Sequence, residues 1–328
     1  MRKGIALLMA LALASLGLLA SVPAAEAGKI RLGFPSRNLM TMPIYLAQER
    51  GIFKKHGLDV EIIYIRGGSA TTKAIVAEKI DVMWNEPIAT MKAMQKGAKL
   101  TFVTAATQRA SYQLVTKSDI KSLAELKGRA IGISRPGAIS YIMPNIVLRR
   151  SGLDPDIANY LPIGTSGARR KALIAGKIDA GVMHVESALK AAERPGLHIL
   201  VSIPKILPKY PFFWVVLRND FLKRNPGDVT NLVKSVIEVN RYAVKNKAEV
   251  VRVAKKHMAL EEKYLSLGFD KLLGLKSFSL NGGLTRDAYD FIIEVGTLYK
   301  QIKKKLPFNQ YVDMSFQEAA LKDLGRVP

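Results

Sequence analysis

The sequence predicts an α/β protein built from two similar lobes, and two observations lead to this fold class. Patterns typical of strands and helices alternate along the chain, stop, and start again; such alternation implies a mostly parallel sheet with helices on both faces. In addition, residues 73–81 (KAIVAEKID) return almost unchanged as residues 171–179 (KALIAGKID). Each copy follows a Gly/Ser/Thr-rich turn, at residues 67–69 and 164–167. A single pair of distant copies indicates two related domains, whereas a solenoid repeats at short intervals.

The first alternation precedes Arg109. Strands are predicted where apolar or β-branched residues alternate or cluster, at residues 29–34, 58–65, 81–84 and 100–103. Helices are predicted between them, at residues 44–53, after the turn at 67–69, and from Pro87 to Gly97. Pro87 suits the first turn of a helix, and Gly97 suits the position just after its end.

The second alternation follows Arg109. Its strands are predicted at residues 112–116, 130–134, 160–163, 180–185 and 198–203. Helices are predicted at residues 122–127 and 139–150, over the second copy of the repeat, and at residues 186–193. A last strong strand at 212–217 is followed, from Gly227 onward, by a basic and helical tail.

The helical tail determines how the chain completes the first lobe. Helices alone cannot complete a sheet, so strand 212–217 is predicted to return to the first lobe, with the tail packed there. The chain then crosses between lobes twice, near residues 106–111 and 206–212, and the two crossovers form a two-strand hinge. The predicted lobes are residues 28–110 with 212–328, and residues 111–211, with a cleft between them.

Residues 1–27 carry the pattern of a cleavable export signal. Arg2 and Lys3 precede an apolar run at residues 5–19, and Ala25-Glu26-Ala27 supplies small residues at a cleavage site. The apolar run is short for a membrane span, although an uncleaved N-terminal anchor is the alternative. The chain has no cysteine, which excludes a lipid-modified cysteine, disulfides, thiol catalysis and zinc–thiolate sites. This composition fits a periplasmic location.

Composition and charge limit the classes of partner. The chain after the signal is long enough for two domains with real cores, and 48% of all residues are hydrophobic. Lys+Arg 50 against Asp+Glu 27 gives a net charge of +23, which favours nucleic acid, anionic lipid or an anionic ligand. The densest basic run, residues 300–305, carries no nucleic-acid-binding motif, so no nucleic-acid partner is predicted. Most basic residues are expected to form a solvated surface.

Candidate ligand-binding residues follow from the rule that ligands of open α/β sheets lie beyond the carboxyl ends of the strands. The loops at these ends and the crossovers supply Ser36, Arg37, Asn38, Gly68, Ser69, Asn85, Glu86, Gln108, Arg109, Arg135, Gly137, Ala138, Ser166, His184, Glu186 and Phe213.

Helix starts and arginines among these residues favour an anionic ligand. Free N–H groups at a helix start attract anions, and Gly68-Ser69, Gly137-Ala138 and Ser166 stand at such starts, although ordinary capping explains the same residues. Three loop arginines have two explanations: Arg37, Arg109 and Arg135. Each guanidinium either binds a carboxylate or sulfonate through two N–H groups, or belongs to an ordinary surface arginine.

Other candidates need a different explanation. Glu86 and His184 occupy corresponding positions in the two halves, which would place them across the cleft from each other. His184 is either a site residue or a buried structural histidine, and Phe213 either lines the pocket or belongs to the core. A purely anionic ligand does not suit Glu86 unless this residue pairs with an arginine or an amine.

Four segments carry a resemblance to a known family. They are GIFKKHGLDVEII (51–63), SLAELKGRAIGIS (122–134), LRRSGLDPD (148–156) and ALIAGKIDAGVM (172–183). Together they resemble the solute-binding proteins of ABC importers, in the nitrate/sulfonate/taurine and thiamine-pyrimidine-precursor group. The resemblance implies a two-lobe periplasmic binding protein of type II, usually monomeric, that closes on a solute and delivers it to a membrane permease. The cysteine-rich motif known from thiamine-pyrimidine members is not matched.

Four functions are therefore considered, the last of them a basic interaction protein. The first is an extracytoplasmic binding protein that captures a small anionic organic solute, a sulfonate or carboxylate, for an ABC importer. The second is an enzyme on the same fold with Glu86 and His184 as an acid–base pair. The third is a periplasmic sensor subunit that docks on a kinase. No nucleophile motif or phosphate loop supports an enzyme, and His184-x-Glu186 alone is a weak metal signal, so neither metal nor cofactor is predicted.

Overall fold

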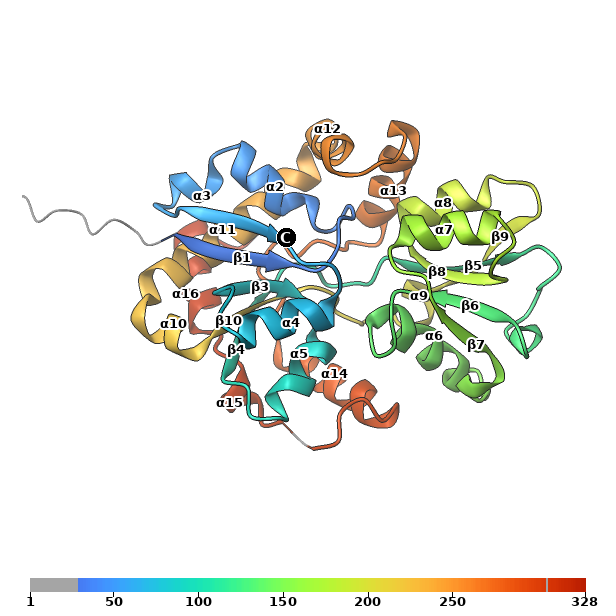
Figure 1. The fold of residues 1–328 in the computed structure, drawn as a ribbon. Helices are drawn as coiled ribbons and strands as arrows, with labels where there is room; N and C mark the ends of the chain where they lie inside the picture. Colours follow the sequence, from blue (N-terminus) through green and yellow to red (C-terminus); the bar gives the residue numbers. More distant parts are fainter. Residues whose placement is uncertain (1–28, 305) are drawn as a thin grey trace, which may run out of the picture.

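The computed structural model describes residues 29–304 and 306–328, so the predicted signal at 1–27 lies outside the described residues. The described chain forms two lobes, each a five-stranded sheet flanked by helices (Figure 1). The strands are β1 (Ile30–Phe34), β2 (Val60–Tyr64), β3 (Val82–Asn85), β4 (Leu100–Ala105), β5 (Tyr112–Lys117), β6 (Ala130–Ile133), β7 (Asn159–Pro162), β8 (Ala180–His184), β9 (Leu197–Ser202) and β10 (Trp214–Arg218). Their order is β2-β1-β3-β10-β4 in the first lobe and β7-β6-β8-β5-β9 in the second. The predicted two-lobe α/β fold is confirmed.

The helices that flank these sheets follow the same alternation. They are α2 (Met42–Glu49), α3 (Ile52–Lys55), α4 (Gly68–Val76), α5 (Pro87–Met94), α6 (Ile139–Arg150), α7 (Ser166–Ile174), α8 (Val185–Ala192), α9 (Ile203–Ile206), α10 (Asn219–Arg224), α11 (Pro226–Lys245), α12 (Lys247–His257), α13 (Glu262–Gly274), α14 (Arg286–Leu298), α15 (Phe308–Tyr311) and α16 (Ser315–Leu324). The helix predicted at 44–53 is split because Gly51 adopts a left-handed conformation with φ 66°. The short helix predicted at 122–127 is a 3₁₀ turn at Ala124–Leu126.

The two sheets have the same topology. In each, one strand runs antiparallel to both of its neighbours: β10 between β3 and β4, and β5 between β8 and β9. Each of these strands is the first along the chain after a crossover from the other lobe. The crossovers lie side by side, because Phe212 N–H donates to Thr107 O over 3.2 Å and Ala106 N–H donates to Phe213 O over 2.9 Å. The strand predicted at 212–217 begins at Trp214, and residues 212 and 213 belong to the crossover.

The sequence repeat has the same structural role in both lobes. Ile80 packs on Gly33 of β1, where a Cβ would overlap the isoleucine side chain, and Ile178 packs on Gly132 of β6 in the same way. The last residue of each copy is an aspartate. Asp81 accepts the backbone N–H of Arg31 over 3.0 Å, and its counterpart Asp179 accepts that of Ala130 over 2.9 Å. The repeat therefore fixes β1 in the first sheet and β6 in the second.

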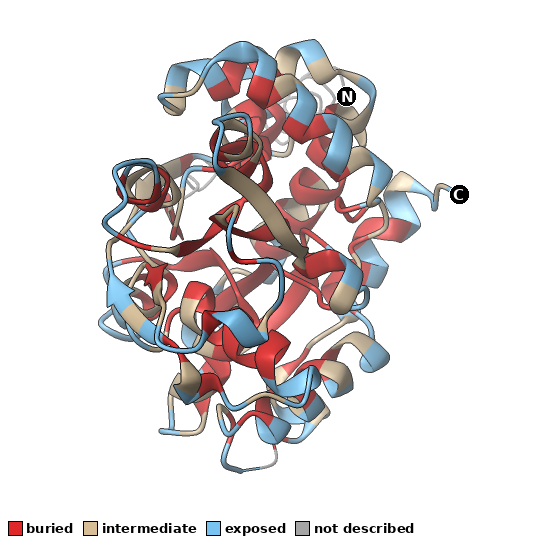
Figure 2. Ribbon diagram, turned by 90° about the vertical axis from the view of Figure 1, so that its right-hand side faces the viewer, coloured by how far each residue is buried: buried red, intermediate tan, exposed pale blue. Residues whose placement is uncertain are grey.

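The central strands β3, β10 and β8 are buried between the helices, whereas β9 is half-buried and β7 at the edge of the second sheet is mostly exposed (Figure 2). The helical tail packs on the first lobe, where α11 contacts α2 and α16 contacts β4. One tail helix reaches further, because α13 also packs against α8 of the second lobe (Figure 1). Ion pairs of Lys190 with Glu261 and of Lys263 with Glu193 line this second contact between the lobes.

We propose the sequence-based bounds, residues 28–110 with 212–328 and residues 111–211, as the limits of the two lobes. None of the helices within residues 29–304 and 306–328 combines the length and the apolar character that crossing a bilayer requires.

Candidate ligand-binding site

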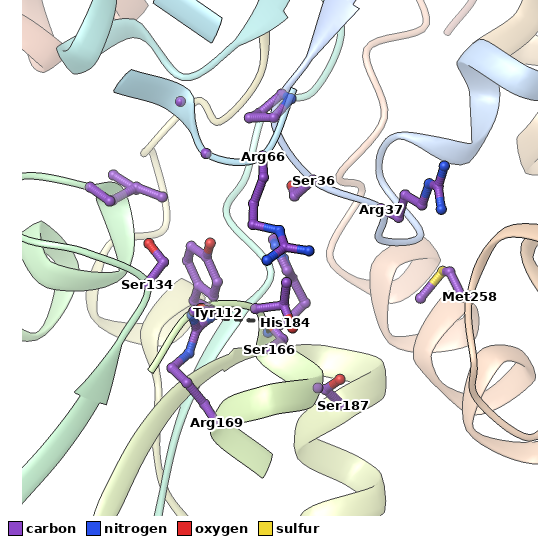
Figure 3. A pocket seen from close by; sticks show the side chains of 18 of the residues that line it. Ser36, Arg37, Arg66, Tyr112, Ser134, Ser166, Arg169, His184, Ser187 and Met258 are labelled. Atoms are coloured by element: carbon purple, nitrogen blue, oxygen red, sulfur yellow. Dashed lines mark hydrogen bonds between the residues drawn. The ribbon is translucent and has the colours of Figure 1, made fainter. Parts of the chain in front are cut away.

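A cavity of about 330 Å³ lies between the two lobes. Its volume suits a small organic molecule. The first lobe contributes residues that follow β1, β2 and β3, and the second contributes residues that follow β6, β7 and β8. These are the carboxyl ends of the parallel strands, as the topology rule requires. Figure 3 shows Arg66 reaching from the first lobe toward Tyr112, His184 and Ser166 of the second.

Glu86 presents the first buried carboxyl group of the cavity. It stands at the start of α5 and lies against Gly68, where a Cβ would overlap both carboxyl oxygens, so only glycine fits there. Its Oε2 is covered by protein and has no hydrogen-bond partner within the described chain. Burial raises the pKa of Glu86 to about 7. This carboxyl group occupies the start of α4, so that helix end is not free for a ligand anion.

Glu186 presents a second buried carboxyl group from the opposite lobe. It lies in the first turn of α8, and α13 covers it, since a Cβ on Gly268 would stand 2.9 Å from Glu186 Cβ. Burial raises the pKa of Glu186 to about 7, against the backbone N–H of Leu39 and the charge of Arg170. As with Glu86, the described residues offer its Oε2 no hydrogen-bond partner.

His184 is held as a neutral ring. Its Nδ1 lies 2.8 Å from Ser111 Oγ, and the ring stacks on Tyr112 with centroids 4.3 Å apart. Burial, followed by the charge of Arg169, lowers the pKa of His184 to about 3. The side chain is therefore uncharged at any pH near neutrality.

Arg169 forms a rigid support beneath the cavity. Its Nε donates to Val182 O over 2.6 Å, another N–H donates to Gly164 O, and Nη2 donates to Ser166 Oγ over 3.0 Å. Burial lowers the pKa of Arg169 to about 10, so the guanidinium stays charged near neutrality. These bonds fix the turn at which α7 begins and leave this arginine few donors for a ligand.

The mouth of the cavity carries further arginines. Arg37 lies over the Tyr64 ring at 4.7 Å and is exposed. Arg135 of the second lobe crosses to the first, where its Nη2 donates to Arg66 O over 2.8 Å. Its guanidinium lies 3.0 Å from the position of a Gly67 Cβ, and Gly67 has φ +91°. Exposed guanidinium groups from both lobes are thus available to an anionic group at the mouth.

The structure brings ten of the sixteen predicted site residues to this cavity. They are Ser36, Arg37, Gly68, Glu86, Arg135, Ala138, Ser166, His184, Glu186 and Phe213. Asn38, Ser69, Asn85 and Gly137 do not line it. Asn38 and Asn85 instead hold local structure: Asn38 Nδ2 donates to Ser36 Oγ over 2.7 Å, and Asn85 Nδ2 donates to Thr72 Oγ1 over 3.0 Å.

Gln108 and Arg109 lie elsewhere. Both line a separate depression formed with Pro208, Lys209 and residues at the start of α14. The side chain of Thr107 bonds Phe213 N–H inside the hinge, over 2.8 Å, and the chain then turns outward. A crossover residue can face either side of the hinge, and the sequence pattern does not distinguish the sides.

Sequence reasoning missed several lining residues. Arg66 stands just before the predicted turn at 67–69, and Arg169 stands just after the one at 164–167. The available signal was the length of an arginine side chain, which can reach a cavity from such a position. Tyr112 lies within a predicted strand, where the sequence pattern does not distinguish a lining residue from a core residue. Residues 257–260 come from the tail, which gave no motif that points to the cleft; His257 there stacks on Tyr45 with centroids 3.6 Å apart. No group of three or more metal-ligating side chains is placed to hold a metal within the described ranges.

A family model described as NMT1/THI5 like matches residues 38–250, which is more than half of the chain. The chain belongs to this family. It is 20% identical over 297 residues to the Bacillus subtilis binding protein YtlA, covering 88% of this chain and 89% of that protein. It is 28% identical over 218 residues to a Saccharomyces cerevisiae 4-amino-5-hydroxymethyl-2-methylpyrimidine phosphate synthase, covering 62% of this chain and 63% of the yeast enzyme.

Among solved structures, the periplasmic aliphatic sulphonate binding protein SsuA from Escherichia coli superimposes with a TM-score of 0.72 at 16% identity. The match covers 87% of this chain and 92% of SsuA. The fold is therefore that of periplasmic binding proteins, and the resemblance identified from the sequence segments is confirmed. The family includes both binding proteins and an enzyme by name, so the activity has to be argued from the site.

Proposed function

We propose that this protein is an extracytoplasmic solute-binding protein of an ABC importer. It captures a small organic solute with an anionic group, a sulfonate or carboxylate, between its lobes and delivers it to a membrane permease. In this proposal the protein is monomeric, lies in the periplasm, is exported by residues 1–27 and requires no cofactor. The observation that carries the proposal is the cavity between the lobes, which residues of both lobes line. Within the described residues, the backbone passes between the two sheets at two crossovers.

The charge of the mouth supports an anionic group on the solute. Arg37, Arg66 and Arg135 come from both lobes and line one cavity. No acidic side chain lies within 4.0 Å of any of the three in the described part of the protein. Apart from the Arg135 Nη2 bond to Arg66 O, the charge of these groups is available to a ligand, and a ligand that contacts both lobes binds the closed state better than the open one.

Binding without turnover fits the chemistry of the floor better than acid–base catalysis does. The enzyme alternative pairs Glu86 with His184, and it requires that this histidine exchanges protons near the working pH. His184 has a pKa lowered to about 3 by burial, and Ser111 occupies its Nδ1. We therefore assign it a structural role: with Tyr112 it forms the aromatic part of the cavity floor.

The test measures binding of sulfonates and carboxylates by calorimetry and thermal unfolding, in the protein and in two arginine variants. Arg135→Ala removes an arginine at the mouth, and Arg109→Ala removes one that faces the separate depression. Loss of one charge-assisted contact predicts affinity about tenfold lower or more for Arg135→Ala, with Arg109→Ala unchanged. An equal loss in both variants would place the anion outside this cavity. Conversion of the solute by the protein would establish an enzyme instead.

A further inference from the structure

Two carboxyl groups at the floor of the cavity have unused acceptor capacity. Glu86 is 4% exposed and Glu186 is 2% exposed, yet neither Oε2 meets a hydrogen-bond donor in the part of the chain that is described. A buried polar atom without a partner is costly, because the water lost on burial is not replaced. Glu86 is the residue just before α5, and Glu186 lies in the first turn of α8, so the two carboxyl groups come from helix starts on opposite lobes.

These carboxyl groups share one cavity. Glu86 and Glu186 line the same cavity as Tyr112. Arg169 stands beneath, with its N–H groups committed to Val182, Gly164 and Ser166. The protein thus surrounds the floor without supplying the donors that the carboxyl oxygens lack.

The missing donors are of a defined kind. An anionic group is repelled from paired carboxyl groups, and the described residues place no third ligand for a metal ion beside them. An ammonium, an amidinium or an amino group on a ring supplies several N–H donors at once and favours the ionised carboxylates. The mouth arginines, by contrast, suit the anionic end of the same molecule.

We propose that Glu86 and Glu186 form an acceptor pair that binds a nitrogen group of the solute, while the arginines at the mouth bind its acidic group. This inference rests on the proposed function and narrows the solute to one with an acid at one end and an N–H-rich group at the other. Neither carboxyl is assigned a catalytic role.

The experiment compares compounds that differ only in a terminal NH₃⁺ or CH₃ group. The pairs are taurine with propane-1-sulfonate, β-alanine with butanoate, and 4-(aminomethyl)benzoate with 4-ethylbenzoate. Binding is measured by calorimetry to the protein and to Glu86→Gln, Glu186→Gln and Glu294→Gln, the last being an exposed carboxyl on α14 that serves as the control. Glutamine keeps the shape of glutamate and removes its charge.

The expected result is a preference of about tenfold or more for the amine in at least one pair, in the protein and in the control. The preference falls at least several-fold in each of the two floor variants. Equal binding of the amine and the methyl compound in every pair that binds, or a preference that survives in both floor variants, would overturn the inference while leaving solute binding intact. Absence of binding by all six compounds would overturn both. A solute recovered from the denatured protein and found by mass spectrometry to lack nitrogen would also overturn it.

Discussion

The stability of the ligand-free protein should fall as pH rises through the range in which Glu86 titrates. Burial raises the pKa of this carboxyl from 4.5 to about 7, and the groups that face it are Tyr112, Tyr210 and the start of α4 at Gly68. Between these pH values the folded protein binds a proton that the unfolded chain has released. The free energy of unfolding therefore decreases with pH in this window, and the stabilisation is fully present only below about pH 4.5.

The size of the effect follows from the pKa values. A rise from 4.5 to about 7 corresponds to a loss of about 3 kcal/mol between pH 4 and pH 8. Glu86→Gln cannot titrate and retains the shape of the side chain. Relative to the wild type, this variant should therefore gain about 3 kcal/mol over that range, which is several degrees in melting temperature for a chain of this length.

Urea unfolding of the protein and of two variants, from pH 4.5 to pH 8.5, tests this prediction. The comparison between variant and wild type cancels the effect of His184, whose pKa burial lowers to about 3 and whose stabilisation is lost as pH falls below 6.5. Glu294→Gln, on the exposed face of α14, controls for removal of one negative charge. A difference between Glu86→Gln and wild type that stays constant across the pH range would refute the burial argument, and with it the reasoning about the cavity floor.

Three further predictions concern packing. Gly268→Val should hinder closure, because a Cβ there would stand 2.9 Å from Glu186 Cβ and 3.2 Å from its Cα; solution scattering should give a larger radius of gyration, and ligand affinity should fall. Arg169→Met should lower the free energy of unfolding by about 2–4 kcal/mol in urea titrations, since two buried carbonyl groups lose their donor. Gly132→Ala should lower the free energy of unfolding by about 1–3 kcal/mol in the same assay, because its Cβ would overlap Ile178 in a packed core. An unchanged free energy of unfolding would show that the core around Ile178 rearranges without cost.

The architecture could be predicted from the sequence because its determinants are local or repeated. The copies at 73–81 and 171–179 set the same contacts in both lobes, through an isoleucine under a strand glycine and an aspartate that accepts a backbone N–H of the same strand. The two-strand hinge followed from the need to place strand 212–217. Neither inference depended on the direction of an individual side chain.

The site was predicted only in part, because cavity residues are selected by side-chain direction and reach. The rule for strand ends found Glu86, His184 and Arg135, which sit where the backbone turns. It also selected Arg109, whose position on the crossover carries no information about which side it faces. Arg169 was missed because it stands one turn into a helix, and only its length brings it beneath the cavity.

The position of the two carboxyl groups on opposite lobes links recognition of the solute to closure. Closing an empty cleft brings Glu86 and Glu186 together in a water-poor space, and this step is unfavourable unless both stay protonated or find donors. The ion pairs between α8 and α13 are partly exposed, and each offsets little of that cost. In our proposal a solute that carries both an acid and a nitrogen group supplies the missing donors, and only the closed state lets it contact the mouth and the floor together. A solute with the acid alone gains the arginines but leaves the carboxyl groups unpaired, so it stabilises closure less. Discrimination would thus arise from the closed state, in which both lobes enclose the ligand, more than from first contact with either lobe.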